Sequence, residues 1–142
     1  MSEGFSAQWL ALREPADHAA RDPGLSAAAA AALADKRAPH IVDLGCGAGS
    51  NLRGLAPALG PRQRWTLVDY DPRLLDAARA ELKRWADRVE NEGATLTLEK
   101  SGKRIEVAFA QADLAADPAG PLAGEADLVT AAALFDLVSQ AW

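Results

Sequence analysis

The chain has 142 residues, of which 49% are hydrophobic and 25% are charged, and its formal net charge is −5 with a pI near 5.0. This suits one soluble globular domain with its own core, and the acidic balance argues against a general nucleic-acid binder, because phosphate binding requires a basic face. A single cysteine forbids an internal disulfide, and neither an apolar run of ~20 residues nor a secretory signal is present, so we expect a cytoplasmic protein without a membrane anchor.

Residues 1–39 are rich in alanine and helical in character. Ser26 is the expected N-cap of a helix over 27–36, and Pro39 ends that helix. Its alanines have high helix propensity but little to bury, so we expect the helix to pack closely, either over a ligand site or on one face of a sheet. We treat 1–39 as a helical segment that precedes the main domain, residues 40–142.

The next stretch, residues 41–51, reads IVDLGCGAGSN and is a short apolar run that ends in a glycine-rich turn. Its apolar character predicts a buried strand over 41–44. Ser50 and Asn51 then open a helix, which Pro57 is expected to shorten or kink. A strand, a tight turn and a helix N-terminus in succession form a site for a nucleotide-like ligand in α/β sheets. Glycines suit such a turn because they allow positive φ and the close approach of a ligand to bare backbone.

The glycines of the turn are Gly45, Gly47 and Gly49. The third comes two residues after the second, unlike the dinucleotide fingerprint G-x-G-x-x-G, and an acid, Asp43, lies two residues before the first. The segment resembles the class I S-adenosylmethionine-dependent methyltransferases, whose first motif reads acid-x-Gly-x-Gly-x-Gly. The resemblance implies that the glycines pass beneath the methionine part of the donor and that Asp43 orders the loop. Cys46 and Asn51 belong to the same expected donor site.

A second acid, Asp69, follows a predicted strand over 65–68 and lies 20 residues after Gly49 (69 − 49). A carboxylate at the tip of a second strand can hold a ribose, because it accepts hydrogen bonds from both hydroxyls. The segment also resembles the second methyltransferase motif, which implies that Asp69 binds the ribose and that Tyr70 flanks the adenine. Asp71 is instead expected to be the N-cap of the next helix.

The clearest helix is predicted over 72–92, with Gly93 as its C-cap. Its apolar stripe has helical spacing and indicates core packing; the stripe consists of Leu75, Ala78, Leu82, Trp85 and Val89. Two alternating runs, 95–99 and 105–109, then predict a β-hairpin whose second arm is the third strand of the sheet.

Asp113 follows the third predicted strand, and the resemblance implies that an acid at this point contacts the adenine amino group. An ordinary loop acid is the alternative. A Pro/Gly loop over 117–124 leads to a fourth strand over 126–131 (ADLVTA), which resembles the fourth motif of the family. Residues 132–142 are expected to begin another helix.

The family has a three-layer, Rossmann-like α/β fold of seven strands, of which this chain supplies counterparts of the first four. The resemblance therefore implies a domain truncated after the fourth strand, lacking part of the acceptor pocket. A sheet truncated in this way would expose Leu128 and Val129 on an unpaired edge, which invites pairing with another chain. We expect self-association through this edge.

The expected function is the transfer of a methyl group from S-adenosylmethionine to an acceptor that the sequence does not identify. Such an in-line displacement mostly requires positioning, and no residue is assigned a catalytic role. Cys46 has no histidine close in sequence to act as its base, and His18 and His40 show no metal-ligand spacing.

Two other functions remain open. An NAD-dependent dehydrogenase shares the strand, turn and helix, although the glycine spacing and Asp43 count against it. A methyltransferase-like domain can also serve as a non-catalytic binding or scaffolding module, because fold does not fix function. The three functions differ in ligand: a methyl donor, a nicotinamide cofactor, or neither.

Overall fold

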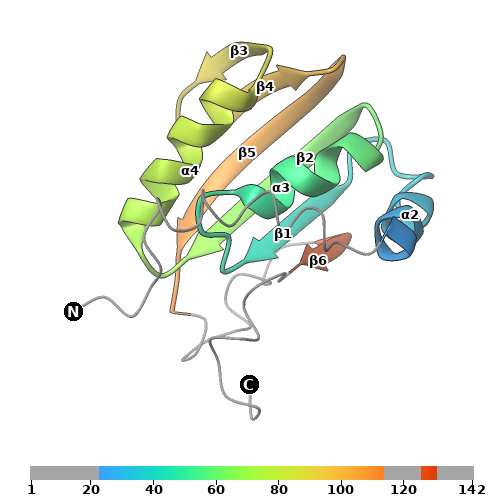
Figure 1. Ribbon diagram of the computed structural model, residues 1–142, viewed down its shortest axis with the longest axis horizontal. Helices are drawn as coiled ribbons and strands as arrows, with labels where there is room; N and C mark the ends of the chain where they lie inside the picture. Colours follow the sequence, from blue (N-terminus) through green and yellow to red (C-terminus); the bar gives the residue numbers. More distant parts are fainter. Residues whose placement is uncertain (1–22, 114–125, 131–142) are drawn as a thin grey trace.

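The computed structural model describes residues 23–113 and 126–130 (Figure 1). The helices are α2 (Pro23–Ala32), α3 (Ser50–Leu55), the 3₁₀ turn η1 (Ala56–Ala58) and α4 (Pro72–Trp85). The strands are β1 (His40–Leu44), β2 (Arg62–Asp69), β3 (Arg88–Glu92), β4 (Leu96–Lys100), β5 (Lys103–Gln111) and β6 (Leu128–Thr130). The predicted loop over 117–124 and helix over 132–142 lie outside the described residues.

The strands form one mixed sheet in the order β3-β4-β5-β2-β1-β6. Neighbours among β5, β2, β1 and β6 are parallel, whereas β3–β4 and β4–β5 are antiparallel. The buried strand over 41–44, the hairpin and the pairing of its second arm within the sheet are therefore confirmed. The second strand is longer than the predicted 65–68. The predicted strand over 126–131 begins only at Leu128, and residue 131 lies outside the described residues.

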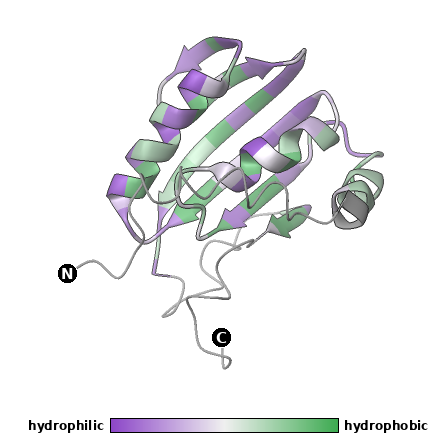
Figure 2. Cartoon of the chain, in the orientation of Figure 1, coloured by the Kyte–Doolittle hydropathy of each residue, from purple (hydrophilic) through white to green (hydrophobic). Residues whose placement is uncertain are grey.

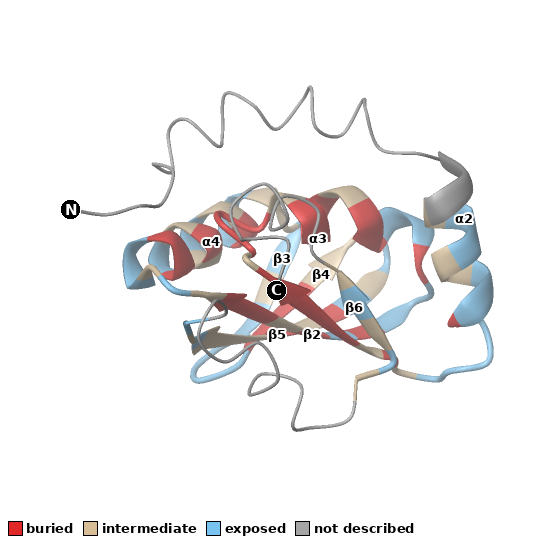
Figure 3. Cartoon of the chain, turned by 90° about the horizontal axis from the view of Figure 1, so that it is seen from below, coloured by how far each residue is buried: buried red, intermediate tan, exposed pale blue. Residues whose placement is uncertain are grey.

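The main core lies between the sheet and the helices α3 and α4, which cover the same face (Figure 3). Leu52 of α3 and Leu82 of α4 are fully buried against strand residues such as Trp65 and Leu67. Because strand side chains alternate between the two faces, hydrophobic and hydrophilic residues alternate along β5 (Figure 2). Pro57 lies in η1, so the proline ends α3 after six residues, as predicted.

The predicted helix over 72–92 is wrong in its last turns, because α4 ends at Trp85 and Arg88–Glu92 is strand β3. Val89 continues the helical stripe in sequence, but it packs on the core from a strand. Gly93 lies in the turn between β3 and β4 and is not a helix C-cap. The backbone of β3 pairs with β4, and this tertiary pairing overrides the local helical pattern.

The predicted helix over 27–36 is also displaced, because α2 begins at Pro23 and ends at Ala32. Ser26 therefore lies inside the helix and is not its N-cap. Proline suits a first helical position, where its missing N–H would have no partner in any case. The helix contacts η1, and Leu33 directly after it joins the core, so α2 packs against the domain rather than over the glycine turn.

A buried glutamine ties β2 to the turn before it. Gln63 is 1% exposed, and its Nε2 donates to the carbonyl oxygens of Ala56 and Gly60, each at 2.9 Å. Its Oε1 accepts a hydrogen bond from Trp65 Nε1 at 2.9 Å. The side chain thus satisfies three other buried or half-buried polar groups around the largest side chain of the core.

Candidate functional site at the carboxyl end of the sheet

The predicted site residues gather where the parallel strands end. Strands β2 and β5 lie to one side of β1, and β6 lies to the other, so the strand order reverses at β1. Ligands of open α/β sheets bind outside the carboxyl ends of the strands at such a reversal. The glycine turn follows β1 at this edge, and Asp69 ends β2.

The turn has the backbone conformation that its glycines predict. Gly45, Gly47 and Gly49 have φ values of 66°, 55° and 87°, which side chains with a Cβ rarely adopt. Cys46 N–H donates to Val68 O at 2.9 Å, and Gly49 N–H donates to Cys46 O at 3.0 Å. The first bond ties the turn to β2, and the second closes it.

At Gly49 the close neighbours belong to the protein itself. A Cβ at this position would lie 3.4 Å from Arg53 Nη1, 3.6 Å from Ala78 Cβ and 3.8 Å from Leu67 Cδ1. These are ordinary van der Waals distances, so the glycine is required at this position by its positive φ rather than by a lack of space.

Asp69 joins the two motifs. Its Oδ2 accepts a hydrogen bond from Gly47 N–H at 2.9 Å, and its Oδ1 accepts one from Asp71 N–H at 3.0 Å. Burial raises the pKa of the Asp69 carboxyl, and the nearby Asp71 charge adds to the increase, while the bonds from both N–H groups oppose it. The carboxylate is thus held by the turn yet is costly to ionise.

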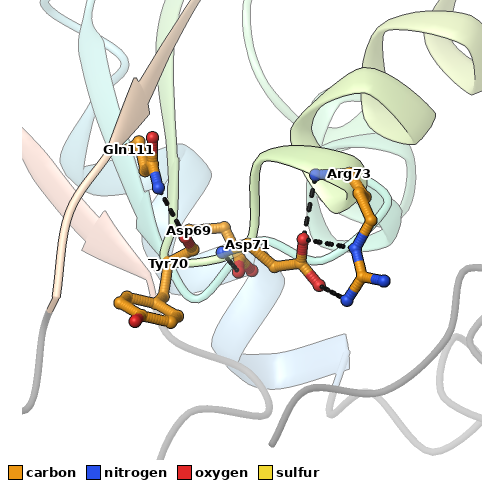
Figure 4. A network of polar contacts seen from close by, with 5 residues as sticks. All are labelled: Asp69, Tyr70, Asp71, Arg73 and Gln111. Atoms are coloured by element: carbon orange, nitrogen blue, oxygen red, sulfur yellow. Dashed lines mark hydrogen bonds and ion pairs between the residues drawn. The ribbon is translucent and has the colours of Figure 1, made fainter. Parts of the chain in front are cut away.

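Tyr70 and Asp71 point in different directions from the loop after β2 (Figure 4). Tyr70 is 68% exposed, and its carbonyl oxygen accepts a hydrogen bond from Gln111 Nε2 at 3.1 Å. Asp71 Oδ1 accepts from Arg73 N–H at 2.9 Å, which confirms Asp71 as the N-cap of α4. Asp71 therefore serves the helix, while the Tyr70 ring remains accessible at the site.

Asp113 is exposed and follows the end of β5. Ala112 N–H donates to Asp69 O at 3.1 Å, which fixes this end of β5 beside the end of β2. Asp69, Tyr70 and Asp113 therefore lie on the same edge of the sheet.

A buried polar cluster lies on the other side of the turn, between β1, α3 and β6. Asp43 is 1% exposed, and its Oδ1 accepts from Asn51 Nδ2 at 3.3 Å and from Thr130 Oγ1 at 3.0 Å. Asn51 is 5% exposed, and within the described part of the chain its Oδ1 has no hydrogen-bond partner. A buried acceptor of this kind calls for a donor, which a water molecule or a ligand group can supply.

Sequence reasoning missed two residues of this region, Thr130 and Arg53. Thr130 lies opposite Asp43 in the β1–β6 register, so the strand-reversal rule applied to residues 126–131 could have found it. Arg53 lies between the core residues Leu52 and Leu55 in α3. A cation at such a position indicates a buried charge that needs a polar partner, and this was the signal in the sequence.

The Cys46 thiol is buried, and its Sγ donates to Gly47 O at 3.4 Å. Burial raises its pKa well above the usual range, and the charges of Asp43 and Asp69 raise it further. A thiol in this state is a poor nucleophile, so Cys46 has a packing role in the turn.

Cys46 is consequently expected to react with dithiobis(nitrobenzoic acid) at least about tenfold more slowly than a free thiol at neutral pH. It is the sole cysteine of the chain, so the rate at which thionitrobenzoate is released by native protein and by protein in urea measures its reactivity directly. Equal rates in the two states would contradict the burial of the thiol.

His40 also has a structural role, since its Nε2 lies 2.8 Å from Thr66 Oγ1 in a hydrogen bond. Over residues 23–113 and 126–130, no group of three or more His, Cys, Asp or Glu side chains could hold a metal ion. His18 lies outside those ranges. No helix in the same ranges is long and apolar enough to cross a membrane.

Comparison with known proteins agrees with this geometry. Residues 42–141 match the family model described as a methyltransferase domain. A stretch of 52 residues is 50% identical to the biotin biosynthesis bifunctional protein BioCD of Bordetella avium (strain 197N). The stretch amounts to 37% of this chain and 11% of that protein.

A solved structure from Methanococcus maripaludis, described as a proposed S-adenosyl-L-methionine-dependent methyltransferase, superposes with a TM-score of 0.55 at 16% identity. The superposition covers 99% of this protein but only 57% of the Methanococcus chain. The similarity confirms the Rossmann-like fold. Since the family model matches well over half of the chain, the protein belongs to the class I S-adenosylmethionine-dependent methyltransferase domain family.

Proposed function

We propose that the chain binds S-adenosylmethionine across the carboxyl ends of β1, β2 and β5 and serves the transfer of its methyl group to an acceptor. The observation that carries this proposal is the 2.9 Å hydrogen bond from Gly47 N–H to Asp69 Oδ2, between residues 22 positions apart. It joins the glycine turn and the strand-tip acid, the two motifs of the family, into one site.

The side chains at this edge suit the parts of the donor. Each Asp69 oxygen accepts one backbone N–H and has further lone-pair capacity, which suits the two ribose hydroxyls. The exposed Tyr70 ring offers a face to the adenine, and Asp113 an acceptor to its amino group. On the other side of the turn, the buried acceptor of Asn51 beside Asp43 suits the ammonium of the methionine part.

When bound, the donor supplies a methyl group on a sulfonium, which leaves as the acceptor attacks in line. The chain contributes positioning, which accounts for much of the rate enhancement in such displacements. Asp69 orients the ribose, and the turn fixes the methionine part. We assign no general base, because an acceptor needs one only if it must lose a proton.

Calorimetric titration of the purified chain with S-adenosylmethionine, its demethylated product and NAD tests the proposal. Saturable binding of the first two and none of NAD is the expected result. Binding of NAD alone would identify a dehydrogenase-type site. No binding by a folded chain would contradict the proposal and favour a non-catalytic module.

We also propose self-association through β6, which is an edge strand of the described sheet. Val129 on this strand is 43% exposed, whereas β3 at the opposite edge carries the charged residues Arg88, Glu90 and Glu92, which oppose pairing with another chain. The chain at tens of micromolar is expected to scatter light as a dimer or larger species, and Val129→Lys is expected to restore the monomer. Asn91→Lys on β3 is the control and should change nothing; a monomeric wild-type chain would contradict the proposal.

A further inference from the structure

Arg53 folds back from α3 over the glycine turn. Its side chain is buried, with 8% of the residue exposed, and its Nη1 donates to Ala48 O at 2.7 Å. The guanidinium lies beside Gly49, because Nη1 is 3.4 Å from the position of a Cβ on that residue. A buried charged donor at this distance forms one of the stronger kinds of hydrogen bond in proteins.

The bond from Arg53 starts a relay of two peptide units. The C=O of Ala48 and the N–H of Gly49 belong to one planar peptide unit and point in opposite directions. This Gly49 N–H donates to Cys46 O at 3.0 Å. The C=O of Cys46 shares the next unit with Gly47 N–H, which donates to Asp69 Oδ2 at 2.9 Å.

The relay therefore runs from a cation to an anion, and every peptide in it has the favourable direction. Ala48 O accepts from the Arg53 guanidinium, Gly49 N–H donates to Cys46 O, and Gly47 N–H donates to the Asp69 carboxylate, so each carbonyl accepts from the Arg53 side of the relay and each N–H donates toward the Asp69 side. Hydrogen bonds arranged in such a chain polarise one another and gain strength together. Rotation of either peptide unit would break two bonds at once.

We propose that Arg53 is a positioning residue that, through these two peptide units, holds the glycine turn and the Asp69 carboxylate in the arrangement that binds the donor. The inference rests on the proposed function for its ligand, while the relay itself belongs to the free protein. In this role Arg53 acts through the turn and not by contact with the donor. It sets the fraction of molecules whose glycine turn is competent to bind. The apparent affinity for the donor falls in proportion as this fraction falls.

Arg53→Met tests the relay, because it keeps an unbranched apolar stem and removes the donor. In the free variant, amide hydrogen exchange followed by NMR is expected to be about tenfold faster than in the wild type at both Gly49 and Gly47. Arg53 does not contact the Gly47 amide, so faster exchange there reports on the relay and not on a lost direct contact. Cys46 N–H lies in the same turn but outside the relay, since it donates to Val68 O, and its exchange should be unchanged. Arg53→Lys, which keeps a cationic donor, is expected to recover protection at both glycines, and it supplies the test if Arg53→Met does not fold.

Donor affinity supplies the second measurement. Calorimetry is expected to give a dissociation constant about tenfold higher for Arg53→Met than for the wild type. Arg62→Met is the matched control, because Arg62 is exposed at the start of β2, and it should bind as the wild type does.

Three results would overturn the inference. The first is unchanged exchange at Gly47 and Gly49 in Arg53→Met, and the second is an equal acceleration at Cys46, which would indicate general destabilisation. The third is equal donor affinity of Arg53→Met and a binding-competent wild type, which would leave the proposed function intact. A wild-type chain that binds no donor would overturn the proposed function and, with it, the ligand role of Arg53, whereas selective opening of the two glycines would still identify the relay.

Discussion

Asp69→Ala is expected to weaken donor binding by about a hundredfold or more. A carboxylate that accepts bonds from two ribose hydroxyls forms charge-assisted bonds, each contributing about 1.5–3 kcal/mol. A loss of about 2.7 kcal/mol corresponds to a hundredfold in the dissociation constant. The substitution also removes the partner of Gly47 N–H. Calorimetry at neutral pH measures the effect.

Asp71→Ala is the matched control for Asp69→Ala. It removes a carboxylate two residues away that caps α4, so it should cost about 1 kcal/mol of stability and little donor affinity. Asp69→Ala with the affinity of the wild type would exclude Asp69 from the site.

The pKa of Asp69 adds a pH dependence to this prediction. Because burial raises that pKa in the folded protein, the native carboxyl takes up a proton at a pH where the unfolded chain remains ionised. Ionised Asp69 thus lowers stability above the raised pKa, and this cost disappears as the pH falls to the usual carboxyl range. Donor affinity should fall as the pH decreases through the same window, because the ionised Asp69 carboxylate accepts hydrogen bonds from both ribose hydroxyls. Asp69→Asn should remove this pH dependence.

Gln63→Leu is expected to lower the free energy of unfolding by about 2 kcal/mol. The change leaves Trp65 Nε1 and the carbonyl oxygens of Ala56 and Gly60 without the partner they have in the native fold. Trp65 Nε1 is then left unsatisfied in the core, which costs about 1–3 kcal/mol, whereas Ala56 O keeps its hydrogen bond from Leu59 N–H and Gly60 is exposed to water. Urea unfolding followed by tryptophan fluorescence measures the change.

Gln111→Leu makes the same substitution at an exposed position, where Gln111 donates to Tyr70 O. Its effect on stability should lie within about 0.5 kcal/mol. A similar loss in both variants would show that leucine itself, rather than the buried network, destabilises the protein.

The burial of β1 and the conformation of the glycine turn follow from features visible in the sequence. The apolar run at 41–44 is buried because β1 has strands on both sides, and the positive φ of the turn follows from its glycines. The end of α4 could not be predicted in this way. Val89 fits the apolar spacing of the helix, yet it lies in β3. Only the pairing of this segment with β4 decides between helix and strand.

The contacts within the site were less predictable than its position. Asp69 could be placed at a strand tip, but its bond to Gly47 N–H depends on how the turn folds back over β2. The burial of Arg53 could have been inferred from its place among core residues of α3, but its partner, the Ala48 carbonyl, depends on the direction of a single peptide, which no spacing rule encodes. Thr130 depends on the register of a strand 87 residues from Asp43.

The pairing of β6 with β1 has a consequence for folding kinetics. Lys100 and Lys103 face each other across a short turn, so β4 and β5 pair by local closure, whereas Thr130 reaches Asp43 across 87 residues of chain. Loop-closure entropy grows with the length enclosed, and within the described part of the chain β6 offers three residues to offset it. We therefore expect β6 to join the sheet last and to leave it first under denaturant, which makes the Asp43 cluster the slowest part of the site to assemble.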